Sequence, residues 1–128
     1  MLILFGITLS LIFYVGLILT HVLILLNKIP YTLVNGGRNQ SYIQQQKLSI
    51  FSIVIAIMGS GFISFYWILP DVINHIIYIV ILGLLTIYWL LGVLLQFLGT
   101  WFEKYFMSLL ALLGFIGHLL YLIALLMN

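Results

Sequence analysis

The sequence has 128 residues, of which 66% are hydrophobic and 5% are charged, and its mean hydropathy is +1.36. A water-soluble domain keeps roughly a quarter of its residues charged, so lipid must be the solvent for most of this surface. The net charge of +2 gives no reason to expect a nucleic-acid partner, and the absence of cysteine excludes disulfides, thiolate chemistry and cysteine-ligated metals.

Four apolar runs are each long enough to cross a bilayer core of about 30 Å, which needs about 20 helical residues. The sequence therefore predicts an all-α fold, a bundle of four transmembrane helices that forms a single domain over residues 1–128. The predicted helices cover residues 2–26, 48–69, 72–97 and 106–127. The first run has no basic residue near Met1 and is longer than a signal-peptide core, so we expect it to be retained.

The connections between the predicted helices differ in length and polarity. Residues 27–47 form the only long polar segment, whereas Pro70 and Asp71 alone separate the second and third helices. We expect Asp71 to cap the third helix, because a carboxylate can accept hydrogen bonds from the free N–H groups at a helix start. The third connection, residues 98–105, is short and aromatic.

The basic residues predict how the helices are oriented. In a four-span protein the first and third loops lie on one side of the membrane, and all the Lys and Arg residues lie in or beside these loops: Lys28, Arg38, Lys47 and Lys104. By the positive-inside rule, loops 1 and 3 are cytoplasmic and both termini are external. We expect a multi-pass protein of a bacterial cytoplasmic membrane.

Small residues predict where the helices pack against each other. Lipid gives little hydrophobic drive for association, so helices associate best where small side chains let their backbones approach. The second helix has such residues at every fourth position, and the fourth helix has them at every third. We expect these positions to form the seam of the bundle, with a dimer interface as the alternative: Ser52, Ala56, Ser60, Ser64, Gly114 and Gly117.

Three polar side chains are predicted inside the membrane: His21, His118 and Gln96. An intramembrane histidine is a functional hypothesis by default. By the helical rise, His21 lies roughly 9 Å and His118 roughly 20 Å from the same membrane face, too far apart in depth to share a metal ion. We expect neutral histidines that donate to neighbouring helices, with proton or ligand handling as the alternative, and no metal or cofactor.

The predicted cytoplasmic face carries a turn and a group of charges. Residues Asn35, Gly36 and Gly37 read as a tight turn, because glycine tolerates positive φ. Glu103 is the only acid on this face. We expect it to pair with Arg38 or Lys47 and so to latch loops 1 and 3 together. The alternative is a cationic pocket for anionic lipid headgroups or a partner's acidic segment, in which Lys104 takes part.

The chain resembles a loosely defined family of small four-span bacterial membrane proteins. That family has the pattern Gly-x-Pro-(Tyr/Trp)-Gly, Gly-Gly, Arg-x-x-Ser-x-x-Ser and, later, Glu-(Arg/Lys). The similar segments here are Ile29-Pro30-Tyr31, Asn35-Gly36-Gly37, Lys47-Leu48-Ser49-Ile50-Phe51-Ser52 and Glu103-Lys104. The family has no settled activity, so the resemblance implies the four-span topology and a bacterial origin and no site.

Function is predicted mainly by what the chain lacks. No span contains an acid, which disfavours a proton-coupled drug exporter, and no nucleophile is paired with a base, so we predict no catalytic residue and no enzyme. Our first hypothesis is an accessory or scaffold subunit for another membrane protein or a cell-envelope assembly system. The alternatives are a small oligomeric channel or transporter, and a protein that binds anionic lipid or a lipid carrier.

Overall fold

The computed structural model describes residues 1–127, and within that range it contains four long helices and no strand. Each is long and apolar enough to cross a membrane, the fourth together with the helical turn before it. The helices are α1 (Leu2–Leu25), α2 (Tyr42–Ile68), α3 (Ile76–Phe97) and α4 (Ser108–Leu126). The predicted all-α transmembrane bundle is confirmed.

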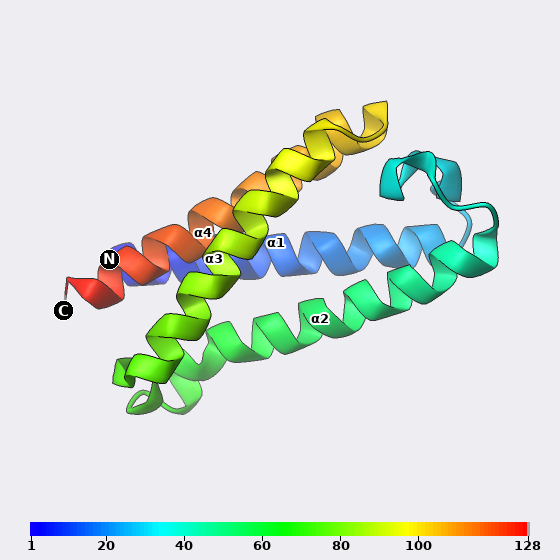
Figure 1. Cartoon of the computed structure of the whole chain (residues 1–128). Coiled ribbons are helices and arrows are strands. Elements are labelled where there is room, and N and C mark those ends of the chain that lie inside the picture. Colours follow the sequence, from blue (N-terminus) through cyan, green and yellow to red (C-terminus); the bar gives the residue numbers. More distant parts are fainter. Residues whose placement is uncertain (128) are drawn as a thin grey trace.

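The central pair of the bundle is α1 and α4, which lie side by side (Figure 1). The outer helices pack on this pair, α2 against α1 and α3 against α4. Although a short turn joins α2 to α3, the two helices diverge from that turn onward (Figure 1). Both termini lie at the end of the bundle where this turn is. We call the opposite end, which carries residues 26–41 and 98–100, the loop end.

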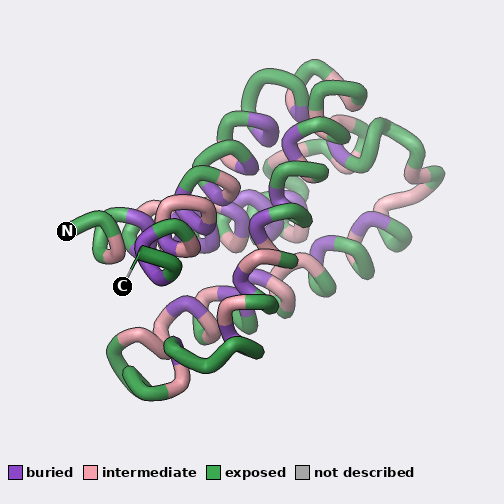
Figure 2. The backbone as a smooth tube through the Cα atoms, turned by 60° about the vertical axis from the view of Figure 1, so that its left-hand side comes forward, coloured by how far each residue is buried: buried purple, intermediate pink, exposed green. Residues whose placement is uncertain are grey.

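Burial follows the contacts between the helices. Buried residues form narrow stripes where the helices face each other, and the outer faces are exposed along their whole length (Figure 2). Many exposed side chains are large and apolar, for example Ile57, Leu84 and Leu109. Such an outer surface is expected in lipid, which is as apolar as the interior of the bundle.

The closest approach in the bundle is between the backbones of α1 and α4. A Cβ added at Gly6 would stand 2.6 Å from the backbone nitrogen of Tyr121, and one at Gly117 would stand 2.6 Å from the backbone nitrogen of Ser10. A Cβ at Gly114 would meet the Phe13 ring at 2.8 Å. These contacts place Gly114 and Gly117 at the seam between α1 and α4.

The packed face of α2 differs from the predicted stripe. Of the four expected residues only Ala56 is buried, while Ser60 and Ser64 donate hydrogen bonds of 2.8 Å to carbonyl groups of their own helix. A hydroxyl in lipid can be satisfied in this way, so a small polar residue does not have to lie in an interface. The face that packs consists of Gln45, Ser49, Ala56, Gly59 and Ile63.

The second helix begins at Tyr42, six residues before the predicted start, because side chains cap it. The Ser41 hydroxyl accepts from the Gln44 N–H at 3.4 Å, and Oε1 of Gln44 accepts from the Gln40 N–H at 2.9 Å. This arrangement is a variant of the capping box Ser-x-x-Gln. The apolar run alone did not reveal it, and Lys47 consequently lies inside α2.

The start of the third helix was predicted wrongly. Residues Val72–Asn74 form a separate 3-10 turn, and α3 begins only at Ile76. Asp71 is exposed and makes no capping hydrogen bond, and His75 occupies the N-cap position of α3. The 3-10 turn separates Asp71 from the first free N–H groups of α3 and puts them beyond the reach of its carboxylate.

The close contact between α1 and α4 predicts that the stability of the fold depends on Gly6. Gly6→Ala would push a methyl group into the backbone of α4, and we expect it to lower the unfolding free energy by about 1–3 kcal/mol. Gly61→Ala is the control, because nothing lies within 4 Å of a Cβ there, and it should leave the unfolding free energy unchanged or raise it by up to about 1 kcal/mol, since Ala favours the helix over Gly. Denaturation in detergent measures both variants; equal losses would contradict this account of the seam.

Candidate functional site: a groove between α2 and α3

A groove of about 530 Å³ lies between α2 and α3 in the half of the bundle next to the loop end. Its walls are mainly apolar and aromatic, α1 contributes Leu17 and His21, and loop 1 closes the end. The wall residues from the two outer helices include Leu48, Phe51, Ile55, Tyr88, Trp89, Leu91 and Leu95. The groove exists because α2 and α3 pack on α1 and α4 and diverge from each other.

Glu103 joins loop 1 to the start of the fourth helix at the closed end of the groove. It is 6% exposed, and its two carboxylate oxygens accept from the Gly36 N–H at 3.1 and 2.9 Å. The Thr100 N–H donates to the same carboxylate at 2.8 Å. The turn that presents the Gly36 N–H has positive φ at Asn35, Gly36 and Gly37, a conformation that glycine adopts without steric cost.

Glu103 also caps its own helix. The hydroxyl of Thr100 accepts from the Glu103 N–H at 3.3 Å while the Glu103 carboxylate accepts from the Thr100 N–H, which is the capping box Thr-x-x-Glu. The same hydroxyl donates to the Leu33 carbonyl, a second link to loop 1. The chain is helical from Trp101 and includes a π-helical turn, Glu103–Met107, so the fourth helix begins before the predicted residue 106.

The predicted ion pair between Glu103 and Arg38 or Lys47 is absent from residues 1–127, where the partners of this carboxylate are backbone N–H groups. Arg38 instead folds over Gly36, its Nε 3.2 Å from the place where a Cβ of Gly36 would be, and lines the groove. Lys47 and Lys104 are exposed and lie outside the groove. The structure thus separates the predicted charge cluster: Glu103 bonds the loop, and Arg38 faces the groove.

A chain of hydrogen bonds leads from loop 1 to His21 in the groove. Nδ2 of Asn35 donates to Oδ1 of Asn39 at 3.1 Å, and Nδ2 of Asn39 donates to Oε1 of Gln45. Nε2 of Gln45 donates to the Ser49 hydroxyl at 3.0 Å, and that hydroxyl lies 3.1 Å from Nδ1 of His21. Sequence analysis missed Gln45, although its spacing of four from Ser49 puts both on one face of α2.

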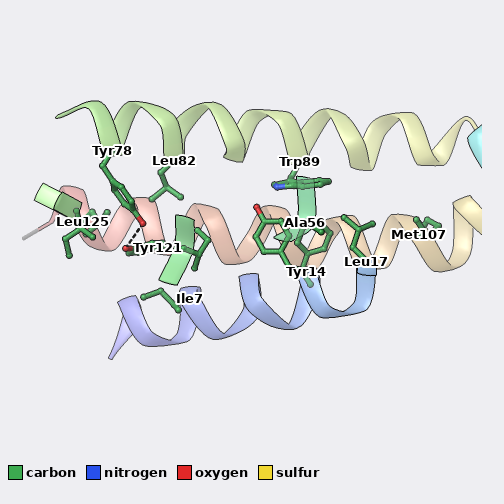
Figure 3. Packing of buried hydrophobic residues seen from close by; sticks show 13 residues of the cluster. Ile7, Tyr14, Leu17, Ala56, Tyr78, Leu82, Trp89, Met107, Tyr121 and Leu125 are labelled. Carbon is green, nitrogen blue, oxygen red and sulfur yellow. Dashed lines mark hydrogen bonds between the residues drawn. The ribbon is translucent and has the colours of Figure 1, made fainter. Parts of the chain in front are cut away.

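Two buried polar atoms that belong to groove residues have no hydrogen-bond partner among the described residues: Nε1 of Trp89 and Oε1 of Gln96. The Trp89 indole packs edge-on against Phe13, and it lies beside the Tyr14 ring in the same way (Figure 3). A buried polar group without a partner costs about 1–3 kcal/mol, and native structures keep few of them. The two atoms lie at different levels of the groove: Gln96 is near the loop end, and Trp89 is seven residues, or about 10 Å, farther along α3.

His118 belongs to a different part of the bundle. It is fully buried between α1 and α4. Its Nε2 lies 3.0 Å from the Tyr14 hydroxyl. Its Nδ1 lies 3.3 Å from the Ser10 hydroxyl and 2.6 Å from the Gly114 carbonyl oxygen. His118 does not line the groove. His118 therefore holds α1 and α4 together, whereas His21 faces the groove.

Comparisons of this chain with models of protein families, with curated proteins and with solved structures give no match. Within residues 1–127 no group of three or more His, Cys, Asp or Glu side chains could hold a metal ion. The resemblance to small four-span bacterial proteins stays a prediction. The functional argument therefore depends on the chemistry of the groove.

The hydrogen bonds that the Glu103 carboxylate accepts predict how loop 1 responds when the carboxylate is replaced. Glu103→Gln removes the charge and leaves one acceptor oxygen, so the Gly36 N–H should exchange with solvent about tenfold faster, as expected for losing a hydrogen bond to a charged group. Hydrogen-exchange mass spectrometry of loop 1 measures this rate. The neighbouring Lys104→Gln is the control and should leave it unchanged. The same exchange rate in both variants would show that Glu103 does not hold the loop.

Proposed function

We propose that this protein is a non-enzymatic lipid-binding protein whose groove between α2 and α3 holds an anionic amphiphile. The observation that carries the proposal is the shape and polarity of the groove, which is apolar along its walls and polar at its closed end. Its volume of about 530 Å³ is within the usual ~300–1,000 Å³ of small-molecule sites. An amphiphile with acyl chains along the walls and its headgroup at the loop end matches this distribution.

The charges at the loop end favour an anionic headgroup. The loop end and the helical turns next to it carry Lys28, Arg38, Lys47 and Lys104 against a single acid, Glu103, and the carboxylate of that acid is already occupied by the Gly36 and Thr100 N–H groups. Arg38 is the one of these cations that lines the groove, and its guanidinium can bind two oxygens of a phosphate. A zwitterionic headgroup would bring a second positive charge close to Arg38.

The groove supports a lipid better than it supports a transport path. The chain of hydrogen bonds from loop 1 ends at His21, and the next polar group, Tyr14 with His118 and Ser10, is buried between α1 and α4 and does not line the groove. A channel or transporter would need a polar route through the rest of the bundle.

The proposal includes a location and an orientation. With its basic loop end on the cytoplasmic side, the protein obeys the positive-inside rule. The groove then opens into the cytoplasmic leaflet, where anionic lipids attract Lys and Arg side chains by about 1 kcal/mol each. A bacterial cytoplasmic membrane provides such a leaflet.

Arg38→Glu tests the proposal, with Lys28→Glu as its matched control, because Lys28 is an exposed cation outside the groove. The protein is purified in mild detergent, and native mass spectrometry measures the retained phosphatidylglycerol and phosphatidylcholine. We expect the native chain to prefer phosphatidylglycerol, and Arg38→Glu to lower its retention about tenfold, because a charge-assisted contact becomes a repulsive one. Lys28→Glu should change retention by less than about twofold.

Two results would contradict lipid binding. One is equal retention of phosphatidylglycerol by the Arg38→Glu and Lys28→Glu proteins. The other is a second membrane protein that copurifies in stoichiometric amount and leaves no lipid bound. The second result would favour the accessory-subunit hypothesis in place of this one.

A further inference from the structure

The structure assigns a specificity role to His21: we infer that its imidazole donates a hydrogen bond from Nε2 to an ester carbonyl oxygen of the lipid in the groove. This inference rests on the proposed function and names the class of lipid, a diacyl glycerophospholipid with an anionic headgroup. It depends on three observations, which are the place of His21 in the groove, the bond at Nδ1 and the direction of the hydrogen-bond chain.

The first observation is the place of the imidazole. His21 lines the groove together with Leu17, four residues before α1 ends at Leu25, which is about 6 Å along the helix axis. Arg38 belongs to loop 1 and lies closer to the loop end. A phosphate at Arg38 therefore leaves the next part of the lipid, the glycerol with its acyl esters, at the level of His21.

The second and third observations indicate which nitrogen carries the proton. Nδ2 of Asn35 starts the chain as a donor, and the amides of Asn39 and Gln45 each accept through the oxygen and donate through the nitrogen to the next group, ending with Gln45 Nε2 donating to the Ser49 hydroxyl. Since that hydroxyl oxygen accepts from Gln45, its own hydrogen is free to donate to Nδ1 of His21. An imidazole that accepts at Nδ1 carries its hydrogen on Nε2.

The resulting donor needs a group that accepts. Among residues 1–127 Nε2 of His21 forms no hydrogen bond, and the residue lines the groove. In a diacyl lipid the acceptors at the boundary between headgroup and acyl chains are the ester carbonyl oxygens. A dialkyl lipid has ether oxygens in place of these carbonyls, and because an ether oxygen is the weaker acceptor, the hydrogen bond from Nε2 would be weaker.

The test compares diacyl with dialkyl phosphatidylglycerol, presented as an equimolar mixture in detergent micelles and measured by native mass spectrometry. We expect the native chain to retain the diacyl lipid about fivefold better, the size of one net hydrogen bond. Both lipids have the same headgroup, so the contact with Arg38 is the same for both.

Two substitutions of His21 separate the roles of its nitrogens. The short amide of His21→Asn reaches the position of Nδ1 and can keep the bond to Ser49, but it presents nothing to the groove. The longer amide of His21→Gln reaches the position of Nε2 and can donate to the lipid. We expect His21→Asn to abolish the preference for the diacyl lipid and His21→Gln to keep part of it.

The outcomes also distinguish this inference from the proposed function. If His21 were only structural, both variants would lose stability and retain both lipids less, with the diacyl-to-dialkyl ratio unchanged. If the diacyl-to-dialkyl ratio is unchanged in both His21 variants while Arg38→Glu lowers the retention of phosphatidylglycerol, the role of His21 is overturned and the lipid groove stands. If the native chain retains neither lipid, the proposed function fails, and the role of His21 fails with it.

Discussion

Because Gly6 and Gly117 have no side chains, the backbones of α1 and α4 touch, and the rest of the bundle is arranged around this contact. His118 adds hydrogen bonds to Ser10 and Tyr14 of α1 at the same seam. With α1 and α4 in direct contact, α2 and α3 pack on the outside of the pair and leave the groove between them. Close backbone packing matters in lipid, where burial of apolar surface gives little drive for helices to associate.

At the loop end a single polar side chain again joins two parts of the fold. One carboxylate, that of Glu103, satisfies N–H groups of two segments far apart in sequence, Gly36 in loop 1 and Thr100 at the start of the fourth helix. Loop 1 is thereby held across the end of the groove, where it places Arg38 and begins the hydrogen-bond chain that reaches His21. The part of the site nearest the loop end therefore depends on a helix cap.

The sequence predicted the four-helix architecture well. A helix that spans a bilayer needs about 20 consecutive apolar residues, and such runs are visible in the composition alone. The sequence predicted the start of α1 correctly but placed the starts of the second and fourth helices too late, because capping extends α2 back to Ser41 and the fourth helix back to Thr100, beyond the apolar runs. It offered a cationic pocket on the predicted cytoplasmic face as an alternative but did not predict a groove between α2 and α3. Which of Ser49 and Ser52 packs and which lines the groove depends on how α2 crosses α1. A small polar residue gives no sign of this, because a hydroxyl such as that of Ser60 can bond its own helix instead.

The central claim is that a lipid of selected chemistry occupies the groove, and site-specific photocrosslinking in native membranes tests it most directly. A photoreactive phenylalanine derivative replaces Phe51, which lines the groove, or Phe97, which is exposed and does not line it. Adducts at Phe51 should be enriched in anionic diacyl lipid over the bulk membrane, whereas those at Phe97 should match the bulk composition. Equal lipid composition at both positions, or a protein adduct confined to Phe51, would contradict the account.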